Sequence, residues 1–379
     1  MTIDGRNVRS SLQAHEGAIL GGLLLLVALF LLPDLGPGTA PGATVRLEHG
    51  RIVELRAVDP VTGAQMALVE YVDGPEAGER VEADIQSSAG PASRPYAVGD
   101  EVVLQVSSTP DGTFVAVSDR WRLPLLAALL AGFGLVVLLV GGWRGVRALL
   151  SLALTVGVVI KVVLPLLLAG WPPIPLAILA GSGVTVATLA LTEGLRRTTL
   201  AAALGTLGAL ALTAVLAAVA NALAGFSQFQ ASEEAVYLRS LVGADFDLGG
   251  VLLAAIIFGA LGVLDDVTIT QAVAVNELAD ADPGASRSAL VGRAMNIGRA
   301  HIAATINTLV LAYVSASLPL LLLFAVGGQS PVVIASTELV AVEVVRTLVG
   351  SVGIVAAVPL TTLIAAALVP WEGRPVRSR

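Results

Sequence analysis

Two adjacent carboxylates lie within an otherwise apolar, membrane-length segment of this 379-residue chain. Asp265 and Asp266 are in the middle of FGALGVLDDVTITQAVAVNE, which runs from Phe258 to Glu277. A carboxylate in hydrocarbon costs roughly 2.5–3.5 kcal/mol even on the most lenient insertion scale, so it requires a partner, a proton or water. The pair therefore predicts a polar site inside a helical bundle.

The spacing of the polar residues places several of them on one helix face. Asp265 and Asp266 point about 100° apart, whereas Asp266, Thr270 and Glu277 share a stripe, because 11 residues return to about 20° past three turns. Such a stripe could line a water-filled or cation pathway, or pair with a basic residue on another helix. The alternative is that the aspartates mark a break in the helix and cap its second half.

Other polar residues at membrane depth could supply counter-charges or further pathway groups. Lys161, the only lysine, falls near the centre of an apolar run, where it either pairs with a carboxylate or stays neutral. Arg299 could instead be a positive-inside anchor, and Asn307 could hydrogen-bond between helices together with Thr308. Glu343 and Arg346 have the i,i+3 spacing of a structural ion pair. The candidate residues for a substrate or ion pathway are Asp265, Asp266, Thr270, Glu277, Lys161, Arg299, His301, Asn307, Glu338, Glu343 and Arg346.

The composition indicates that lipid is the solvent for most of the chain. Hydrophobic residues make up 55% and charged residues 13%, with a mean hydropathy of +0.85, whereas soluble domains carry about 25% charged residues. The absence of cysteine excludes disulfides, thiolate metal sites and a cysteine nucleophile, and three histidines argue against a His-rich metal centre. No nucleotide-binding, serine-hydrolase or zinc-protease motif is present. We expect no cofactor, no nucleic-acid partner and no enzymatic activity.

The apolar runs predict a membrane all-α protein with about eight transmembrane helices, since about 20 residues span about 30 Å of hydrocarbon. The first run could be a signal peptide, but we expect a retained anchor. The last run is long for one upright helix, and it is compatible either with one span or with an embedded helix at 333–347 followed by a span at 348–369. Residues 276–298 predict a cytoplasmic loop containing a short interfacial helix. The runs cover residues 17–33, 123–141, 147–169, 173–192, 199–224, 249–275, 300–326 and 338–369.

The distribution of arginines predicts the orientation of these spans. Eight spans with both termini in the cytoplasm place twelve arginines on the cytoplasmic side, and the short loops opposite contain only Arg239. The twelve are Arg6, Arg9, Arg144, Arg147, Arg196, Arg197, Arg287, Arg293, Arg299, Arg374, Arg377 and Arg379.

Residues 34–122, between the first two spans, have a different character. Short runs of alternating hydrophobicity separated by turn residues predict about five strands in a small antiparallel barrel or sandwich. Fourteen acidic residues against seven arginines give this extracytoplasmic domain a net charge of −7. A solvated surface is the ordinary interpretation, and a face that binds a cation or a protein partner is the alternative. The predicted organisation is a cytoplasmic tail and first helix (1–33), the β-rich domain (34–122), a seven-helix core (123–370) and a cytoplasmic tail (371–379).

Three stretches together resemble the YibE/F family of bacterial multi-pass membrane proteins. They are GALGVLDDVTITQAVAVNEL, GRAHIAATINTLVLAYVSASLPLLLL and TELVAVEVVRTLVGSVGIVAAVPLTTLIAA, and the resemblance covers about residues 121–369. In the family's pattern one aspartate follows the Gly-Ala-Leu-Gly run, whereas here Asp265 and Asp266 form a pair. The resemblance implies a shared fold in the bacterial plasma membrane and strengthens the choice of candidate residues without naming their task.

Three kinds of function are compatible with these features to different degrees. A solute or ion permease that uses intramembrane carboxylates is favoured by the spans and by the ionisable residues at depth; without a nucleotide motif it would be gradient-driven or assisted by other subunits. The alternative is a cell-envelope scaffold or receptor whose exported β-domain binds a partner. An intramembrane aspartyl protease is disfavoured, because it needs two carboxylates facing each other and adjacent residues on one helix point apart.

Overall fold

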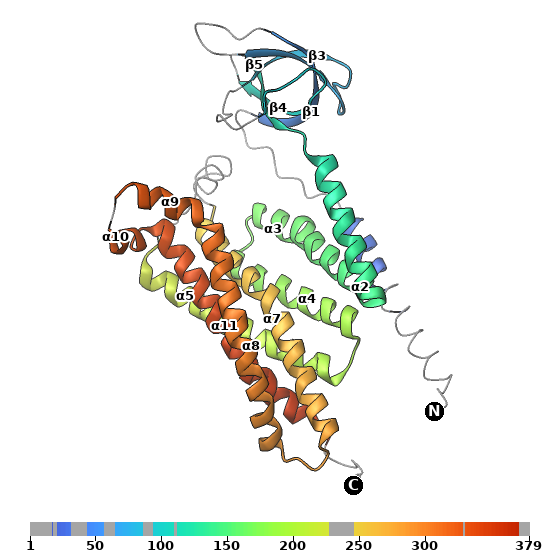
Figure 1. Ribbon diagram of the computed structural model, residues 1–379, viewed down its shortest axis with the longest axis vertical. Helices are drawn as coiled ribbons and strands as arrows, with labels where there is room; N and C mark the ends of the chain where they lie inside the picture. Colours follow the sequence, from blue (N-terminus) through green and yellow to red (C-terminus); the bar gives the residue numbers. More distant parts are fainter. Residues whose placement is uncertain are drawn as a thin grey trace. The chain divides into compact units, whose positions relative to one another are not determined.

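The computed structural model describes residues 17, 21–31, 44–56, 65–85, 94–109, 112–226, 246–328 and 330–370 (Figure 1). It divides the chain into two compact units. One is formed by residues 37–139 and contains a β-barrel, and the other is formed by residues 1–36 and 140–379 and contains a helical bundle.

The barrel is built from five strands, as the alternating runs predicted, and closes in the order β1-β2-β3-β5-β4. Neighbouring strands are antiparallel except β3 and β5, which run parallel, so the prediction of an antiparallel domain was wrong for that pair. The reason is geometric, since an odd number of strands cannot alternate in direction all the way round a closed barrel. The strands are β1 (Thr44–Leu55), β2 (Gln65–Tyr71), β3 (Arg80–Ile85), β4 (Glu101–Thr109) and β5 (Gly112–Arg120).

Alternate residues of each strand point inward and fill the barrel. Val69, Val102 and Leu104 are fully buried, and Ile52 and Val117 nearly so, which is the period-two burial expected of strands with one covered face. The long strand β1 pairs with both β2 and β4. A five-stranded closed barrel with this strand order corresponds to the Greek-key barrel of the OB-fold.

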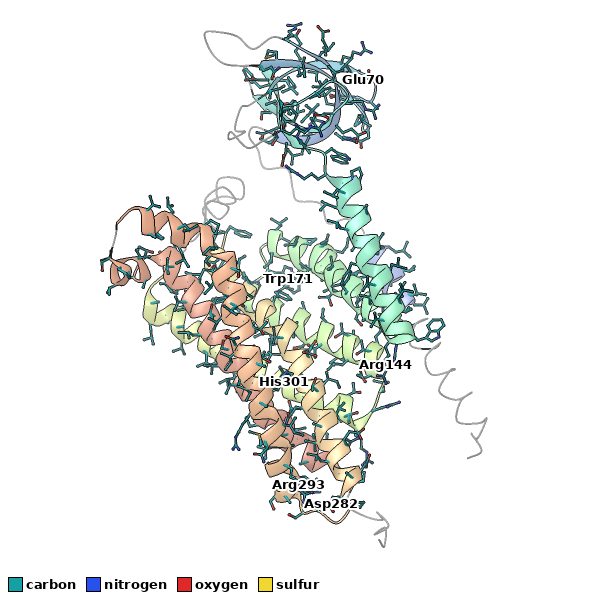
Figure 2. All side chains as sticks on the ribbon, in the orientation of Figure 1. Glu70, Arg144, Trp171, Asp282, Arg293 and His301 are labelled. Atoms are coloured by element: carbon teal, nitrogen blue, oxygen red, sulfur yellow. The ribbon has the colours of Figure 1, made fainter. Side chains whose placement is uncertain are left out.

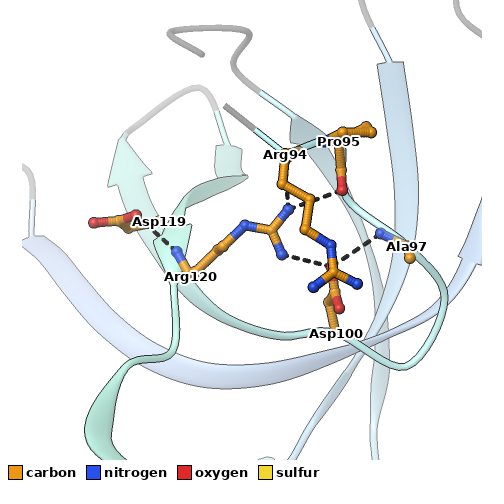
Figure 3. Close-up of polar contacts among 6 residues, drawn as sticks. All are labelled: Arg94, Pro95, Ala97, Asp100, Asp119 and Arg120. Atoms are coloured by element: carbon orange, nitrogen blue, oxygen red, sulfur yellow. Dashed lines mark hydrogen bonds and ion pairs between the residues drawn. The ribbon is translucent and has the colours of Figure 1, made fainter. Parts of the chain in front are cut away.

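A polar cluster around Arg120, at the end of β5, joins that strand to the segment before β4 (Figure 3). The guanidinium group donates to the carboxylate of Asp100 at 2.7 Å and to the carbonyl oxygens of Arg94 and Pro95 at 2.6 and 2.9 Å. The same carboxylate accepts a hydrogen bond from the backbone N–H of Ala97 at 3.0 Å. One arginine thus satisfies two loop carbonyls and a carboxylate.

Six helices among the described residues are long and apolar enough to cross a membrane. Two differences separate them from the eight predicted spans. The first predicted span is described only as a ten-residue helix, Gly21–Phe30, and the next two fall in a single helical segment, Leu123–Leu168. The helices of this part of the chain are α2 (Leu123–Val158), the π-helical turn η1 (Val159–Val163), α3 (Leu164–Leu168), α4 (Pro173–Glu193), α5 (Arg197–Ala224), α7 (Leu248–Ala281), α8 (Arg287–Ala316), α9 (Leu318–Val326), α10 (Pro331–Ala335) and α11 (Glu338–Leu368).

Helix α2 is not one continuous helix, because Gly142 interrupts it with φ 52° and ψ −132°. A residue with a Cβ atom rarely adopts that conformation, so the glycine marks the point where two helices meet end to end. The break lies in the gap between the predicted runs 123–141 and 147–169.

One prediction and two alternatives about helix boundaries do not match the structure. Helix α7 passes through Asp265 and Asp266 without interruption, so the aspartates neither break nor cap it. Helix α8 begins at Arg287 and continues as one helix to Ala316, so the basic segment is part of this helix and not a separate interfacial one. Helix α11 is continuous from Glu338 to Leu368, which rejects the alternative of an embedded helix that ends at residue 347. In each case the backbone hydrogen bonds of the helix continue past polar side chains.

Helix α7 is the most buried of the long helices and packs against α4, α5, α8 and α11. Its core-facing residues include Ile257 and Leu264, which pack with Leu210 of α5 and Ile354 of α11. By contrast, only 6% of the most apolar window of α8 is buried. The bundle core is therefore formed by α4, α5, α7 and α11, with α7 in contact with all of the others.

Helices α5 and α11 approach each other through two reciprocal glycine–threonine contacts. A Cβ atom on Gly205 of α5 would lie 2.0 Å from Oγ1 of Thr361 on α11, and one on Gly353 of α11 would lie 2.0 Å from Oγ1 of Thr213 on α5. Small residues let helix backbones come close in a membrane, where packing replaces the hydrophobic effect as the force that joins helices. Each helix therefore receives a side chain of the other at a glycine.

Candidate functional site

Asp265 and Asp266 lie midway along α7 but in different environments. Asp265 is largely enclosed where α7 packs on α4 and α5, whereas Asp266 is exposed. The backbone carbonyl of Asp266 accepts a hydrogen bond from the hydroxyl of Thr270 at 2.7 Å. The structure thus selects Asp265 as the inward carboxylate of the pair.

Threonine hydroxyls surround the carboxylate of Asp265. Thr185 of α4 donates to Oδ1 at 3.0 Å. Thr206 of α5 and Thr188 of α4 also lie beside this carboxylate, and the hydroxyl of Thr188 donates to the backbone carbonyl of Thr185 at 3.1 Å. Thr206 in turn shares a 2.7 Å hydrogen bond with Thr268 of α7, whose hydroxyl donates to the backbone carbonyl of Asp265 at 3.2 Å. Thr185, Thr206 and Thr268 are fully buried. Three helices therefore contribute oxygen atoms to one polar cluster, the Asp265 cluster.

No basic side chain takes part in the Asp265 cluster. Among the described residues, the groups that act on its carboxylate are the three threonine hydroxyls of α4 and α5. Hydrogen bonds from neutral groups do not offset the free-energy cost of burying an ionised carboxylate in an apolar interior. The group therefore needs a proton, a cation or water to be stable where it lies.

A second buried polar contact lies about one turn further along α7. Gln271 donates from Nε2 to the backbone carbonyl of Ala294 on α8 at 2.9 Å and to the hydroxyl of Thr362 on α11 at 2.7 Å. Gln271 is 3% exposed and Thr362 fully buried, so the contact joins three helices in the core. This arrangement is a structural one, because both donor bonds of the amide are made within the protein.

A cavity of about 510 Å³ lies where α7 approaches the turn between α4 and α5. Thr270 and Glu277, two residues of the predicted stripe, line it together with Glu193 at the end of α4. Three arginines also line it, namely Arg144 of α2 and, at the start of α5, Arg196 and Arg197. The stripe on α7 therefore faces a polar cavity over part of its length.

The structure confirms one predicted ion pair. Arg346 donates to Oε1 of Glu343 at 2.7 Å within α11, and both side chains are partly exposed. The pair neutralises both charges within the helix, which is the structural role that its spacing indicated.

Most of the remaining candidates lie on surfaces away from the Asp265 cluster. Arg299 is exposed and donates to Asn296 at 3.1 Å, and Asn307 is also exposed on α8. His301 lies on the same helix and is half-buried (Figure 2). Lys161 is half-buried in η1, and Glu338 is in the first turn of α11. None of these side chains is among the groups that act on the carboxylate of Asp265.

The residues that the sequence analysis missed are the uncharged ones. Thr185, Thr188, Thr206 and Thr268 were not among the candidates, because a lone threonine is common in apolar helices and carries no charge that needs a partner. One signal was available, since Thr185, Thr188 and Thr192 recur at intervals of three and four within an apolar run and so lie on one face of α4.

Comparison with known proteins adds one finding. The family model described as YibE/F-like protein matches residues 129–371. No curated protein and no solved structure matches the chain. The matched residues include all of the Asp265 cluster and exclude the β-barrel.

Proposed function

The chain belongs to the YibE/F-like protein family, and we propose that it is a gradient-driven solute or ion permease that works through an intramembrane carboxylate, Asp265. The observation that carries the proposal is the position of this carboxylate. It lies midway along the most buried apolar helix, surrounded by hydroxyls and without a basic partner among the described residues. A group that must exchange a proton, an ion or water at membrane depth is typical of a transport pathway.

The proposal includes the membrane arrangement. The chain is a multi-pass membrane protein, which we place in the bacterial plasma membrane with eight spans and both termini in the cytoplasm. The break at Gly142 supports counting Leu123–Leu168 as two spans. The shared cavity of Arg144, Arg196 and Arg197 supports the orientation, because these arginines come from two connections between predicted spans that are both expected on the cytoplasmic side. Residues 34–122 are then extracytoplasmic.

The test compares cells expressing the wild-type protein, Asp265→Asn and Asp266→Asn at matched membrane levels. We expect untargeted profiling of metabolites and metal ions to show a solute whose level changes in Asp265→Asn and stays at the wild-type level in Asp266→Asn. The second variant is a matched control, because it makes the same chemical change one residue away at an exposed position. Identical profiles for all three proteins would contradict the permease.

The alternative function is a cell-envelope scaffold or receptor, and the acidic barrel is the observation that favours it. The barrel is a separate compact unit outside the matched family region, and residues 34–122 carry a net charge of −7. Removing residues 34–122 distinguishes the two functions. A permease core should keep an Asp265-dependent change in solute levels, whereas a scaffold should lose the partner that crosslinks to it in the intact envelope.

A further inference from the structure

The Asp265 cluster has the composition of a binding site for a hard cation. Its ligand atoms are all oxygens, namely a carboxylate on α7 and the hydroxyls of Thr185, Thr206 and Thr268. Hard cations prefer oxygen ligands, whereas softer transition metals favour nitrogen and sulfur. No group of three or more His, Cys, Asp or Glu residues suited to a metal ion occurs among the described residues.

The charge of the cluster indicates how much positive charge it can hold. One carboxylate provides a single negative charge, and the described groups around it are neutral. A monovalent cation would make the loaded site neutral, while a divalent ion would leave a net positive charge in an apolar interior. The cluster therefore matches a single positive charge.

Resting on the proposed function, we infer that Asp265 with Thr185, Thr206 and Thr268 binds one monovalent cation, either a proton or Na⁺, whose binding drives transport. In the proton form, the carboxylate becomes a carboxylic acid and hydrogen-bonds to a threonine hydroxyl. In the Na⁺ form, the carboxylate and hydroxyl oxygens coordinate the ion and replace part of its water shell. Both forms neutralise the site.

The route to the site is a line of hydroxyls on α4. Thr185 donates to the carboxylate, and Thr188 lies beside it with its hydroxyl bonded to the carbonyl of Thr185 at 3.1 Å. Thr192 continues the same face one turn further, with its hydroxyl bonded to the carbonyl of Thr188 at 2.9 Å. The distance from Thr185 to Thr192 along the helix axis is about 10 Å. Glu193, the next residue, lines the 510 Å³ cavity. The cavity is therefore the entrance from which a cation reaches the hydroxyl line.

The experiment uses the full-length protein, purified and reconstituted in lipid nanodiscs. One measurement is saturable binding of radioactive Na⁺, and the other is the infrared carbonyl signal of a protonated carboxylic acid, followed during a pH titration. Both are made on the wild-type protein, on Asp265→Asn and on Asp266→Asn. Equal thermal unfolding of the three proteins shows that the variants are folded.

Two outcomes support the inference and identify the ion. Saturable Na⁺ binding that disappears in Asp265→Asn and persists in Asp266→Asn assigns the site to Na⁺. A carboxylic acid signal at neutral pH that disappears in Asp265→Asn alone, without Na⁺ binding, assigns it to the proton. If neither signal depends on Asp265, the inference is overturned.

A hydroxyl variant tests whether the threonines are ligands. For a Na⁺ site we expect Thr206→Val to weaken Na⁺ binding roughly 10-fold or more, as loss of groups that orient a metal ligand does, while Thr206→Ser keeps the hydroxyl and retains binding. For a proton site, Thr206→Val should shift the pH at which the carboxylic acid signal appears, and Thr206→Ser should not. An unchanged signal in Thr206→Val would show that the Thr206 hydroxyl does not take part in binding the cation.

The failure of this inference and the failure of the permease have different signatures. A cation signal that depends on Asp265, with no change in any solute in cells, retains the site and rejects the permease. A solute change that depends on Asp265, with neither cation signal, retains the permease and rejects the cation.

Discussion

At the scale of single residues, the main result is that two identical neighbours have different roles. Asp265 is held by hydroxyls of two other helices, whereas Asp266 is exposed and only its backbone carbonyl is engaged by a side chain of α7. The difference arises because adjacent residues on a helix point about 100° apart, so only one of them can face the packed side. The proposed site therefore contains Asp265 and not Asp266.

The hydrogen bond between Thr206 and Thr268 gives a prediction at this scale. Both hydroxyls are fully buried and 2.7 Å apart, so Thr206→Val leaves a buried hydroxyl on Thr268 with one partner fewer. We expect a loss of about 1–3 kcal/mol in the free energy of unfolding. The double variant with Thr268→Val should lose less than the sum of the two single changes, because neither buried partner remains. Unfolding of the purified protein by a denaturing detergent measures all three, and additive losses would show that the hydroxyls do not interact.

At the scale of elements, the close packing of α5 against α11 holds in place the helix that carries Thr206 of the Asp265 cluster. Gly205 precedes Thr206 directly, so the backbone approach of the two helices and the position of the Thr206 hydroxyl depend on the same turn of α5. The packing therefore links the position of a proposed ligand to a contact between helices.

We expect Gly205→Ala to destabilise the protein by about 1–3 kcal/mol, because inserted methyl groups in packed interiors force backbone shifts. The new Cβ would lie 2.0 Å from Oγ1 of Thr361. Gly208→Ala is the matched control, since its Cβ would lie at an ordinary 3.6 Å from Leu360 on the same pair of helices. Thermal unfolding of the three proteins in one detergent makes the comparison. Equal stability of the two variants would mean that α5 and α11 are not in close contact at Gly205.

The turn between α7 and α8 is another element whose form is set by local contacts. Arg293 of α8 forms an ion pair with Asp282 at 2.9 Å, and Figure 2 shows both residues at this turn. Both side chains are about half exposed, so the pair contributes little free energy. The turn is short, since only residues 282–286 separate the two long helices.

At the scale of the whole molecule, the chain combines a soluble type of barrel with a membrane bundle, and the two are held by different forces. The barrel has a core of aliphatic side chains and ion pairs on its surface. The bundle has close helix contacts and buried hydroxyl pairs. Because low pH protonates the carboxylates of these ion pairs, we expect acid to lower the stability of the barrel.

Asp100, whose carboxylate accepts a hydrogen bond from Arg120, shows how pH acts on the barrel. Burial acts to raise the pKa of Asp100, but the hydrogen bonds from the Ala97 N–H and the Arg120 guanidinium outweigh it, so this pKa lies below its ordinary value of 3.8. A carboxyl whose pKa is lower in the folded state stabilises that state above the unfolded pKa. This contribution is lost as the pH falls through the folded pKa.

We therefore expect Arg120→Met to lower the stability of the barrel by about 2 kcal/mol, since it leaves two carbonyls and a carboxylate without their donor. The acid-induced loss of amide protection in β4 and β5 should also begin at a higher pH. Hydrogen exchange of the full-length protein as a function of pH measures both effects. The control is Arg80→Met, which removes an exposed ion pair with Glu70 of the kind that contributes little. Matching pH profiles of the two variants would contradict the role assigned to Arg120.

Much of the architecture follows from the sequence alone, because it depends on local properties. Hydropathy is a sum over neighbouring residues, and it identified the membrane character and the main helical segments. Period-two alternation identified five strands, and the order of motifs identified the family. The ion pair of Glu343 and Arg346 also followed from spacing on one helix.

The tertiary structure decided what depends on residues far apart in the chain. The choice between Asp265 and Asp266 is made by Thr185 and Thr206, which are about 80 and 60 positions away, and no pattern within α7 contains that information. The apolar run at 249–275 continues across both aspartates, so hydropathy does not distinguish one from the other. A helix face acquires its role only when another helix covers it, so the sequence could propose the carboxylates and only packing could choose between them.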